Sequence, residues 1–434
     1  MKMYCEPARE LPVVGSYDVI VAGGGPAGIA AAWAAAANGA ETILLEHANC
    51  LGGMAIPGYM SHWVGTTGSS VYREILKRCL EDPWESEKLS DGNKHVINHE
   101  KQKLVILDLL EEAGVKIQLR TDVVGVCKEG SKVQGVITES KSGREVIEGK
   151  VVIDCTGDGD VAAYAGVPFQ LGREEDQKMQ PVTLMFKLAG VDPETAICPG
   201  SFETLVDVPK GEIQALGRAH LPAPAGHVLL YPSTIPGIVV VNMTNVIDID
   251  GTDVRDLSKA EIICMRQIPE IVKFLREFAP GYEHCYAIAS AANVGVRETR
   301  HFKGLYTLTA EDIVEGRTFD DWIATKCAFN FDIHNVDGAG LDKNGAQKHF
   351  HSKGTYTIPY RCCVPETVDG LLFAGRNISG SHKAHSNYRA MPICCGMGQG
   401  CGTAAAVAVK DQVELRHVDI AKVQELLLKD GVTL

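Results

Sequence analysis

No run of apolar residues in this sequence is long enough to cross a membrane. The longest, from Ile29 to Ala37, ends at Asn38 and Gly39, well short of the about 18 to 20 residues that a transmembrane helix needs. The first residues also lack the continuous apolar stretch of a signal peptide. We therefore expect a cytoplasmic protein without a membrane partner.

Positive charge is also scarce. The 42 Lys and Arg residues are outnumbered by 55 Asp and Glu residues, which gives a net charge of −13, and no basic run is present. Proteins that bind nucleic acids normally carry a basic patch or stripe. The charge therefore argues against a nucleic-acid partner.

The 14 cysteines include no C-x-x-C pair. Zinc and iron–sulfur sites usually use that spacing, so the sequence predicts no metal site. Most of these thiols are interpreted as small, reduced packing residues.

Glycine, by contrast, is abundant. The chain has 434 residues, which favours two structural lobes, and its 45 glycines are about a tenth of it, above the usual ~7%. Such an excess favours a fold in which backbone closely approaches other backbone or a ligand.

The first glycine cluster follows a β-rich run from Tyr17 to Ala22. Gly23, Gly25 and Gly28 form the pattern G-x-G-x-x-G, and Pro26 suits the first turn of a helix. In a strand–turn–helix unit these glycines allow a tight turn, a close approach of backbone N–H groups to a pyrophosphate, and close packing of helix on strand. The helix N-terminus adds favourable partial positive charge.

The helix is expected to end at Asn38 and Gly39, and a second parallel strand then ends at Glu46. A carboxylate at this place can accept hydrogen bonds from a ribose diol. The alternative, a glycine-rich packing turn, leaves Glu46 unexplained. Beyond it, Gly52 and Gly53 allow backbone to lie against a flat ligand. The unit therefore predicts dinucleotide binding.

Two later segments resemble further parts of a known cofactor site. "VVIDCTGDGD" resembles the second FAD motif of the glutathione-reductase-like flavoproteins, and "VDGLLFAGRNISGSHKAHSNYRAMPICCGMGQGCGTAAAVAV" resembles their third. With "NVGVRETRHFKGLYTLTAEDI", the chain is most similar to the branch called the FAD-dependent oxidoreductase family. This resemblance implies an α/β fold, with a Rossmann-like FAD-binding domain and an inserted mixed α+β substrate domain.

The resemblance also implies domain boundaries. We expect an FAD-binding domain in two parts, 14–166 and 355–415, on either side of a substrate domain at 167–354. A C-terminal helix is expected within 416–434.

The resemblance assigns FAD contacts residue by residue. The first turn and strand supply Gly23, Gly25, Pro26, Ala27, Gly28 and Glu46; the next turn supplies Gly52, Gly53 and Met54; and later segments supply Val123 at the adenine, Thr156 and Gly157 at the diphosphate, Gly375 and Arg376 at the ribityl chain, and Gly398, Gly400, Gly402 and Thr403 at the flavin. The last glycines are expected to start a helix whose N–H groups stabilise negative charge at flavin N1 and O2. The alternative is an ordinary buried helix start.

Two features of other flavoenzymes are missing. At the spacing of a redox C-x-x-x-x-C pair, Cys50 is followed by Ala55, which argues against a disulfide reductase. No second G-x-G-x-x-G lies between Gly166 and Gly354. A dedicated nicotinamide domain is therefore not expected, although transient NAD(P)H binding at the flavin stays open.

The segment "SGSHKAHSNYRAMP" contains the first catalytic candidates. His382 and Arg389 match positions that the family commonly keeps as His and Arg. Imidazole suits proton transfer near neutral pH, and Arg suits a carboxylate or an oxyanion. The alternative for His382 is a hydrogen bond to flavin or backbone.

Two further candidates lie in the middle of the chain. His334, in "FDIHN", is expected on a strand that reaches back to the flavin lobe, and Arg297, in "VGVRETR", is a candidate substrate clamp. For Arg300 a structural salt bridge is the preferred interpretation. A packed loop histidine is preferred for His62, and covalent flavin attachment at Cys50 or His47 is not favoured.

The sequence, with this resemblance, thus predicts an FAD-dependent oxidoreductase that transfers a hydride between flavin N5 and a small organic substrate. Oxidation of CH–OH or CH–NH and reduction of C=C all stay open, as do the second redox partner and a homo-oligomer. The alternatives are an RNA-modifying flavoprotein and a non-catalytic flavin-binding protein.

Overall fold

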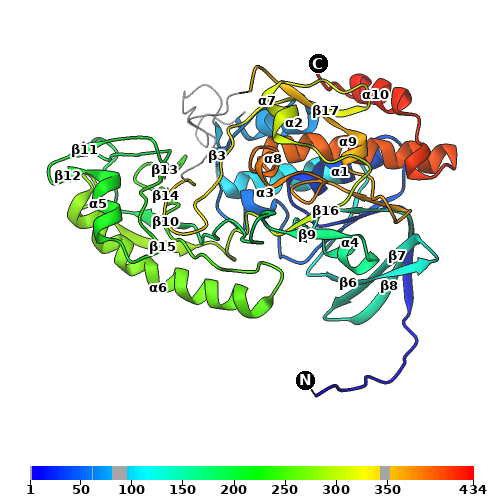
Figure 1. Ribbon diagram of the computed structural model, residues 1–434, viewed down its shortest axis with the longest axis horizontal. Coiled ribbons are helices and arrows are strands. Elements are labelled where there is room, and N and C mark those ends of the chain that lie inside the picture. The colour runs from blue at the N-terminus through cyan, green and yellow to red at the C-terminus, as the bar shows by residue number, and fades with distance from the viewer. Residues whose placement is uncertain (1, 61, 81–94, 343–351) are drawn as a thin grey trace.

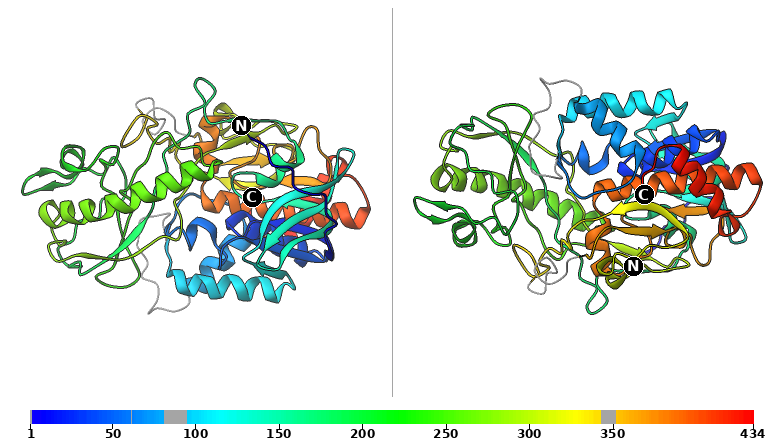
Figure 2. Two further views of the ribbon diagram at one scale, coloured as in Figure 1. Left: turned by 90° about the horizontal axis from the view of Figure 1, so that it is seen from below. Right: turned by 90° about the horizontal axis from the view of Figure 1, so that it is seen from above.

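The computed structural model describes residues 2–60, 62–80, 95–342 and 352–434. They form two parts, one around a largely parallel sheet and one around a smaller antiparallel sheet (Figure 1). Both views in Figure 2 show helix α6 (Val254–Phe278) at one end, away from the helices of the first and last segments. Residues 343–351, within the predicted substrate domain, lie outside the described residues.

The larger sheet is built on the first strand of the chain. Its parallel strands are β1 (Val13–Ala22), β2 (Thr42–Glu46), β5 (Lys116–Leu119), β8 (Gly143–Asp154) and β19 (Leu371–Phe373), and it continues antiparallel through β7 (Lys132–Ser140) and β6 (Asp122–Glu129). β1 lies between β2 and β8, and β19 pairs with β8. The carboxyl ends of these five parallel strands therefore meet at one edge, and the predicted Rossmann-like α/β fold is confirmed.

Two alanine-rich helices, α1 (Pro26–Ala37) and α9 (Met391–Asp411), pack against each other beside this sheet (Figure 1). A Cβ atom at Gly398 would lie 1.9 Å from the carbonyl oxygen of Ala27, and one at Gly402 would lie 2.1 Å from that of Ala31. Since no real Cβ atom comes so close to backbone, these glycines allow the two helices to touch.

The second glycine cluster therefore does not start a helix, and that prediction is wrong. α9 begins at Met391 with Pro392 in its first turn, so Gly398, Gly400 and Gly402 lie in its interior. Interior N–H groups bond to the preceding turn and are not free for a ligand. α9 is also the one described helix long and apolar enough to cross a membrane, and 94% of that apolar window is buried inside the protein.

The smaller sheet belongs to the middle of the chain. It has the order β13 (Leu230–Pro232), β14 (Val239–Val241), β10 (Phe186–Ala189) and β15 (Tyr286–Ser290), with antiparallel neighbours throughout. Phe186 and Val241 share a buried cluster with Leu275 of α6. A separate core on this side of the molecule agrees in outline with a substrate domain, whose boundaries stay predictions.

The other described elements connect and cover these parts. The helices are α2 (Ser70–Leu80), α3 (His99–Glu112), α4 (Asp160–Ala165), α5 (Ile213–His220), α7 (Ala310–Val314), α8 (His382–Tyr388) and α10 (Ile420–Lys429), and the short strand pairs are β3 (His62–Trp63) with β4 (His95–Val96), β9 (Phe169–Leu171) with β16 (Arg300–Phe302), β11 (Asp207–Val208) with β12 (Gly211–Glu212), and β17 (Trp322–Cys327) with β18 (Tyr356–Pro359). α10 agrees with the helix expected near the C-terminus.

Candidate active site

The turn between β1 and α1 leaves room at one glycine only. Gly23 has a φ of +100°, and a Cβ there would lie 2.3 Å from the Cys155 carbonyl oxygen, whereas a Cβ at Gly28 would lie 1.8 Å from the Gly23 carbonyl oxygen. A Cβ at Gly25 would meet nothing nearer than the Gly53 Cα at 3.9 Å. No side chain caps α1 at Gly25. An open, uncapped helix N-terminus suits a pyrophosphate, so this turn fits the predicted cofactor.

Glu46 ends β2 beside this turn and is buried. Its carboxylate accepts the Gly24 N–H at 2.6 Å through Oε2 and the Ala48 N–H at 2.7 Å through Oε1. Each carboxylate oxygen can accept a second hydrogen bond, so a ribose diol can still bind. Val123, the predicted adenine contact, follows closely after Thr121, whose N–H donates to the Glu46 carbonyl oxygen at 3.0 Å.

The next turn folds back onto the first one. Gly52 donates its N–H to the Gly24 carbonyl oxygen at 2.8 Å, and both Gly52 and Gly53 have positive φ. The Met54 side chain reaches the other part of the molecule, because a Cβ at Gly295 would lie 2.6 Å from its Cε. These residues thus lie between the glycine turn and the segment that contains Arg297.

The second and third motifs meet at the ends of β8 and β19. Thr156 donates its N–H and hydroxyl to Asp154 Oδ1 at 3.0 and 2.7 Å. Gly157 has a φ of +86° and lies against the guanidinium of Arg376, which pairs with Asp158 at 2.8 Å. A Cβ at Gly375 would lie 3.3 Å from the Ala27 Cβ. The structure therefore brings the predicted FAD residues of three motifs to one sheet edge.

The residues predicted at the end of the flavin are placed differently. A Cβ at Gly400 would lie 2.6 Å from the Ile323 carbonyl oxygen, and the Thr403 hydroxyl donates to the Gln399 carbonyl oxygen at 3.0 Å. Both residues are used for packing within and around α9. The N-terminus of that helix, which no side chain caps, is at Met391 and Pro392, and these residues replace the glycines as the candidates to face the flavin.

His382 begins α8 and is held by a buried acid. Its Nδ1 lies 2.6 Å from Glu298 Oε1, and His301 Nε2 lies 2.8 Å from the same oxygen. The Glu298 side chain is 0% exposed. Burial acts to raise the pKa of Glu298, but the hydrogen bonds from His301 and His382 outweigh it and keep the pKa well below the usual range. Glu298 is therefore an ionised carboxylate that fixes the His382 ring.

Arg389, at the other end of α8, meets a second acid. Its Nη2 lies 3.0 Å from Asp332 Oδ2 and 2.8 Å from the Asp332 carbonyl oxygen. His334 Nε2 lies 3.3 Å from the same Oδ2. Burial acts to raise the pKa of Asp332, but its interactions with His334 and Arg389 outweigh this effect and lower the pKa.

His334 lies in a loop rather than on the expected strand, since its only ladder contact is an isolated bridge to Leu341. Burial, followed by the charge of Arg297, lowers the pKa of His334 to about 4. The ring is therefore neutral at pH 7 and suits a hydrogen-bonding role.

Arg297 lies near Arg389, Asp332 and His334, but it makes no ion pair with any described residue. Its Nη1 donates to the Pro181 carbonyl oxygen at 2.5 Å and to Thr183 Oγ1 at 3.0 Å. Burial, followed by the charge of Arg389, lowers the pKa of Arg297 to about 10. Arg300 instead pairs with Asp160 at 2.8 Å, which confirms its structural salt bridge.

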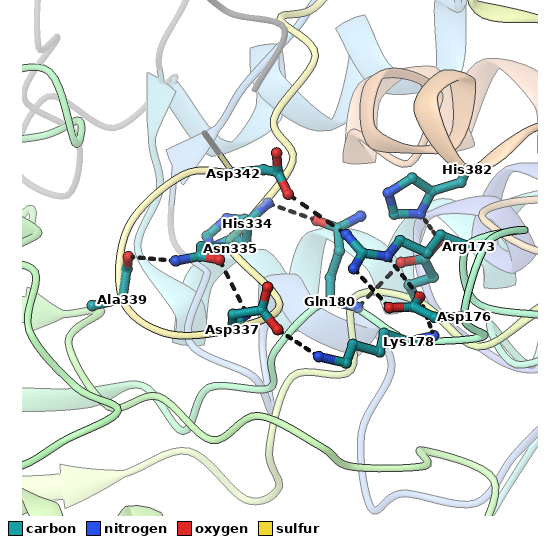
Figure 3. A network of polar contacts seen from close by, with 11 residues as sticks. Arg173, Asp176, Lys178, Gln180, His334, Asn335, Asp337, Ala339, Asp342 and His382 are labelled. Atoms are coloured by element: carbon teal, nitrogen blue, oxygen red, sulfur yellow. Dashed lines mark hydrogen bonds and ion pairs between the residues drawn. The ribbon is translucent and has the colours of Figure 1, made fainter. Parts of the chain in front are cut away.

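Gln180 connects the group around His382 to the group around His334. Figure 3 shows its side chain between these two histidines. Its backbone N–H donates to Glu298 Oε2 at 3.1 Å, and its side-chain Oε1 accepts the His334 N–H at 3.1 Å. One continuous polar network therefore connects all of the predicted catalytic residues except Arg297, which is coupled to it through charge. Gln180, Glu298 and Asp332 were missed by sequence reasoning, although Glu298 and Asp332 adjoin predicted residues.

Two ion pairs hold the loop that carries His334. Arg173 pairs with Asp342 at 3.7 Å, and Lys178 pairs with Asp337 (Figure 3). Both join the loop to the segment that contains Gln180. The position of His334 therefore depends on ion pairs between its loop and the segment that contains Gln180.

Other candidates from the sequence take minor places. Burial raises the pKa of Cys50, which disfavours a reactive thiolate, and His47 lies 3.4 Å from Glu46 on an exposed turn. The His62 ring packs on Tyr231 with 3.7 Å between centroids, as a packed histidine would. Glu298, His301 and His382 have a spacing that a metal ion could use, but two hydrogen bonds already account for this arrangement.

Comparison with known proteins agrees with this geometry. The chain is 28% identical over 231 residues to the digeranylgeranylglycerophospholipid reductase of Methanocaldococcus jannaschii, a match that spans 48% of this chain and 56% of the relative. The chain thus matches about half the length of such curated relatives.

Solved structures share the fold. The p-nitrophenol 4-monooxygenase PnpA from Pseudomonas putida DLL-E4 has a TM-score of 0.51 at 12% identity, over 96% of this chain and 85% of that one. The flavin-dependent brominase Bmp2 has a TM-score of 0.50 at 13% identity, over 95% and 83%. The family described as FAD dependent oxidoreductase matches residues 18–427, so this chain belongs to the FAD-dependent oxidoreductase family and its cofactor is FAD.

Proposed function

We propose that this protein transfers a hydride between FAD and a small organic substrate, with His382 moving the accompanying proton. FAD supplies hydride chemistry at N5 when it is bound. The observation that carries the proposal is the network of His382, Glu298, Gln180, His334 and Asp332, because it collects acid–base and charged groups from distant segments at one place. The order of the three FAD motifs supports a place among the glutathione-reductase-like flavoproteins.

His382 suits a proton-transfer role. Its Nδ1 faces the ionised Glu298, so the proton of a neutral ring stays on Nδ1 and the lone pair on Nε2. Nε2 makes no hydrogen bond to any described residue, and the side chain is 13% exposed. A positioned, accessible imidazole of this kind commonly contributes 10²-fold to 10⁴-fold to a rate.

Reduction of an activated C=C bond is the first reaction to test, because the curated relative is a reductase. CH–OH and CH–NH oxidation use the same groups in reverse. Thiol–disulfide exchange is disfavoured because the raised pKa of Cys50 keeps it a thiol. The second redox partner, a homo-oligomer, the cytoplasmic location and the absence of a nucleic-acid partner stay predictions from the sequence.

Anaerobic flavin absorbance near ~450 nm tests this function. Hydroxy acids, amino acids and polyols are mixed with the oxidised holoenzyme, and activated alkenes with the photoreduced one. We expect at least one class to bleach or restore the absorbance within seconds. No change in either direction, with FAD bound, would contradict the proposal, and tight RNA binding would then favour the RNA-modifying alternative.

A further inference from the structure

Two arginines, Arg297 and Arg389, lie near a single carboxylate, Asp332. Arg389 is paired with Asp332, and Arg297 has no acidic partner within 4.0 Å among the described residues. Both guanidinium groups are partly buried, and the charge of Arg389 lowers the pKa of Arg297. One carboxylate thus serves two guanidinium groups, and Arg297 has no acid of its own among the described residues.

No neighbouring described acid pairs with Arg297. Glu298 is occupied by His301 and His382 at 2.8 and 2.6 Å. Since the ring of His334 is neutral at pH 7, it neither adds to nor offsets the charge. An unbalanced charge that is shielded from water is costly unless an anion pairs with it.

The same cluster contains buried polar atoms without a hydrogen-bond partner. They are Gln180 Nε2 and Arg389 Nε, neither of which has a hydrogen-bond partner among the described residues. Gln180 bonds to the backbone of His334, and Arg389 bonds to Asp332. A buried group without a partner costs about 1 to 3 kcal/mol, so a cluster of them indicates a place where a ligand or water completes the bonding.

We propose that the substrate carries a carboxylate that binds to Arg297 and Arg389, beside a polar group that Gln180 recognises. The planar guanidinium fork matches a carboxylate better than any other small anion except phosphate. This inference rests on the proposed function and names its substrate class. An uncharged apolar substrate would leave Arg297 and the buried polar atoms unpaired.

Equilibrium binding to the oxidised holoenzyme tests the substrate class without turnover. The probes are malonate, succinate and 2-hydroxysuccinate, with their diamides and inorganic phosphate beside them, and the readout is isothermal titration together with the flavin absorbance spectrum. We expect a carboxylate to bind at least about 10-fold more tightly than its amide. Equal binding of acid and amide, no binding of any carboxylate, or tighter binding of phosphate would overturn the proposal.

Variants locate the site. Arg297→Met and Arg389→Met should each weaken carboxylate binding by about 10-fold to 100-fold, and Arg297→Lys should lose less because it keeps the charge. Arg276→Met is the matched control, since this arginine also donates to a carbonyl oxygen, Cys285 O at 2.8 Å, but lies on α6. FAD content and the thermal midpoint show whether each variant is folded. An equal loss in Arg276→Met would contradict the location.

The outcomes separate the two proposals. Carboxylates that bind through Arg297 and Arg389 but exchange no hydride with FAD in either direction would support the anion site and contradict the proposed function. A neutral compound that reduces or reoxidises the flavin, while no carboxylate binds, would leave the function standing and overturn the substrate class.

Discussion

The two glycine clusters look alike in sequence, and in the structure only the first of them contains an open position. Gly25 faces open space at the first turn of α1, whereas Gly398 faces the backbone of that same helix at 1.9 Å. The first cluster leaves room for a cofactor, and the second removes side chains so that two helices can touch. Glycine next to alanine therefore indicates a close approach without showing what approaches.

Proline separates the two cases better than glycine does. α1 begins at Pro26, directly after the open Gly25, and α9 has Pro392 in its first turn, ahead of the whole second cluster. Proline is favoured there because its missing N–H costs nothing and its φ is already helical. The "AMP" before "ICCGMGQG" was thus the signal for the start of α9.

The largest effect is expected from filling the closed cluster. Gly398→Val would drive a branched side chain into the Ala27 carbonyl oxygen, and overpacking of this kind costs about 1 to 3 kcal/mol or more even where neighbours can move. Backbone on a central helix cannot move far, so we expect loss of soluble folded protein. Expression and thermal unfolding measure this. A folded variant within a few degrees of the wild-type midpoint would show that α1 and α9 are farther apart.

Filling the open cluster should spare the fold and remove the cofactor. Gly25 has a φ of −76°, which any residue adopts, and Gly25→Val has space around its Cβ. The side chain would occupy the place of the pyrophosphate, and a clash of about 3 kcal/mol with one lost hydrogen bond of about 1 kcal/mol gives about a 10³-fold loss of FAD affinity. Flavin content at defined free FAD measures it, beside the thermal midpoint of the apoprotein. Full flavin content would contradict the assigned pyrophosphate site.

Changing the polar network should spare both fold and cofactor. His382→Gln keeps a group that can bond to Glu298 but cannot take up a proton, so hydride exchange with substrate should slow by about 10²-fold. Single-turnover flavin kinetics measure the change, and His417→Gln on the exposed surface is the control. A wild-type rate would show that His382 is structural, and so would loss of FAD.

Local patterns were enough to predict the dinucleotide-binding unit, and the resemblance to a known family supplied FAD and the rest of the fold. The strand, turn, helix and strand from Tyr17 to Glu46 each have their own signal, and in the structure β1, α1 and β2 follow that order. The types of the catalytic candidates were also informative, because the structure gathers His382, Arg389, His334 and Arg297 on one side of the molecule.

The partners of those residues could not be predicted. Gln180 precedes a proline in a loop and has no pattern of its own, yet it contacts both Glu298 and His334. Its role arises because folding buries it against segments that lie more than a hundred residues away in the sequence. The interior of α9 poses the same problem. Whether the space beside Gly398 is filled depends on which helix packs against α9, and the sequence of α9 does not show this.

The smallest effect is expected from acid, through the buried His227. Its ring and that of His334 both pack against Phe202, so His227 lies on the side of the polar network. Burial, followed by the charge of His334, lowers the pKa of His227 to about 3. The unfolded chain, with a histidine pKa near ~6.5, takes up a proton that the folded protein does not. This contribution to stability is therefore complete above about pH 6.5 and is lost as the pH falls toward 3, by at most about 1.4 kcal/mol per pH unit.

His227→Phe removes this dependence while keeping a ring against Phe202, whose centroid lies 5.0 Å from that of His227. The free energy of unfolding in urea, measured between pH 7 and pH 5 at saturating FAD, should fall less steeply with pH in the variant, by about 1 kcal/mol per pH unit. His417→Phe, on the exposed surface, is the matched control. The variant and the wild type could instead lose stability in parallel, or the control could flatten the slope as much. Either result would show that buried His227 is not a source of the acid sensitivity, because the folded and unfolded states must then bind the same number of protons at this residue.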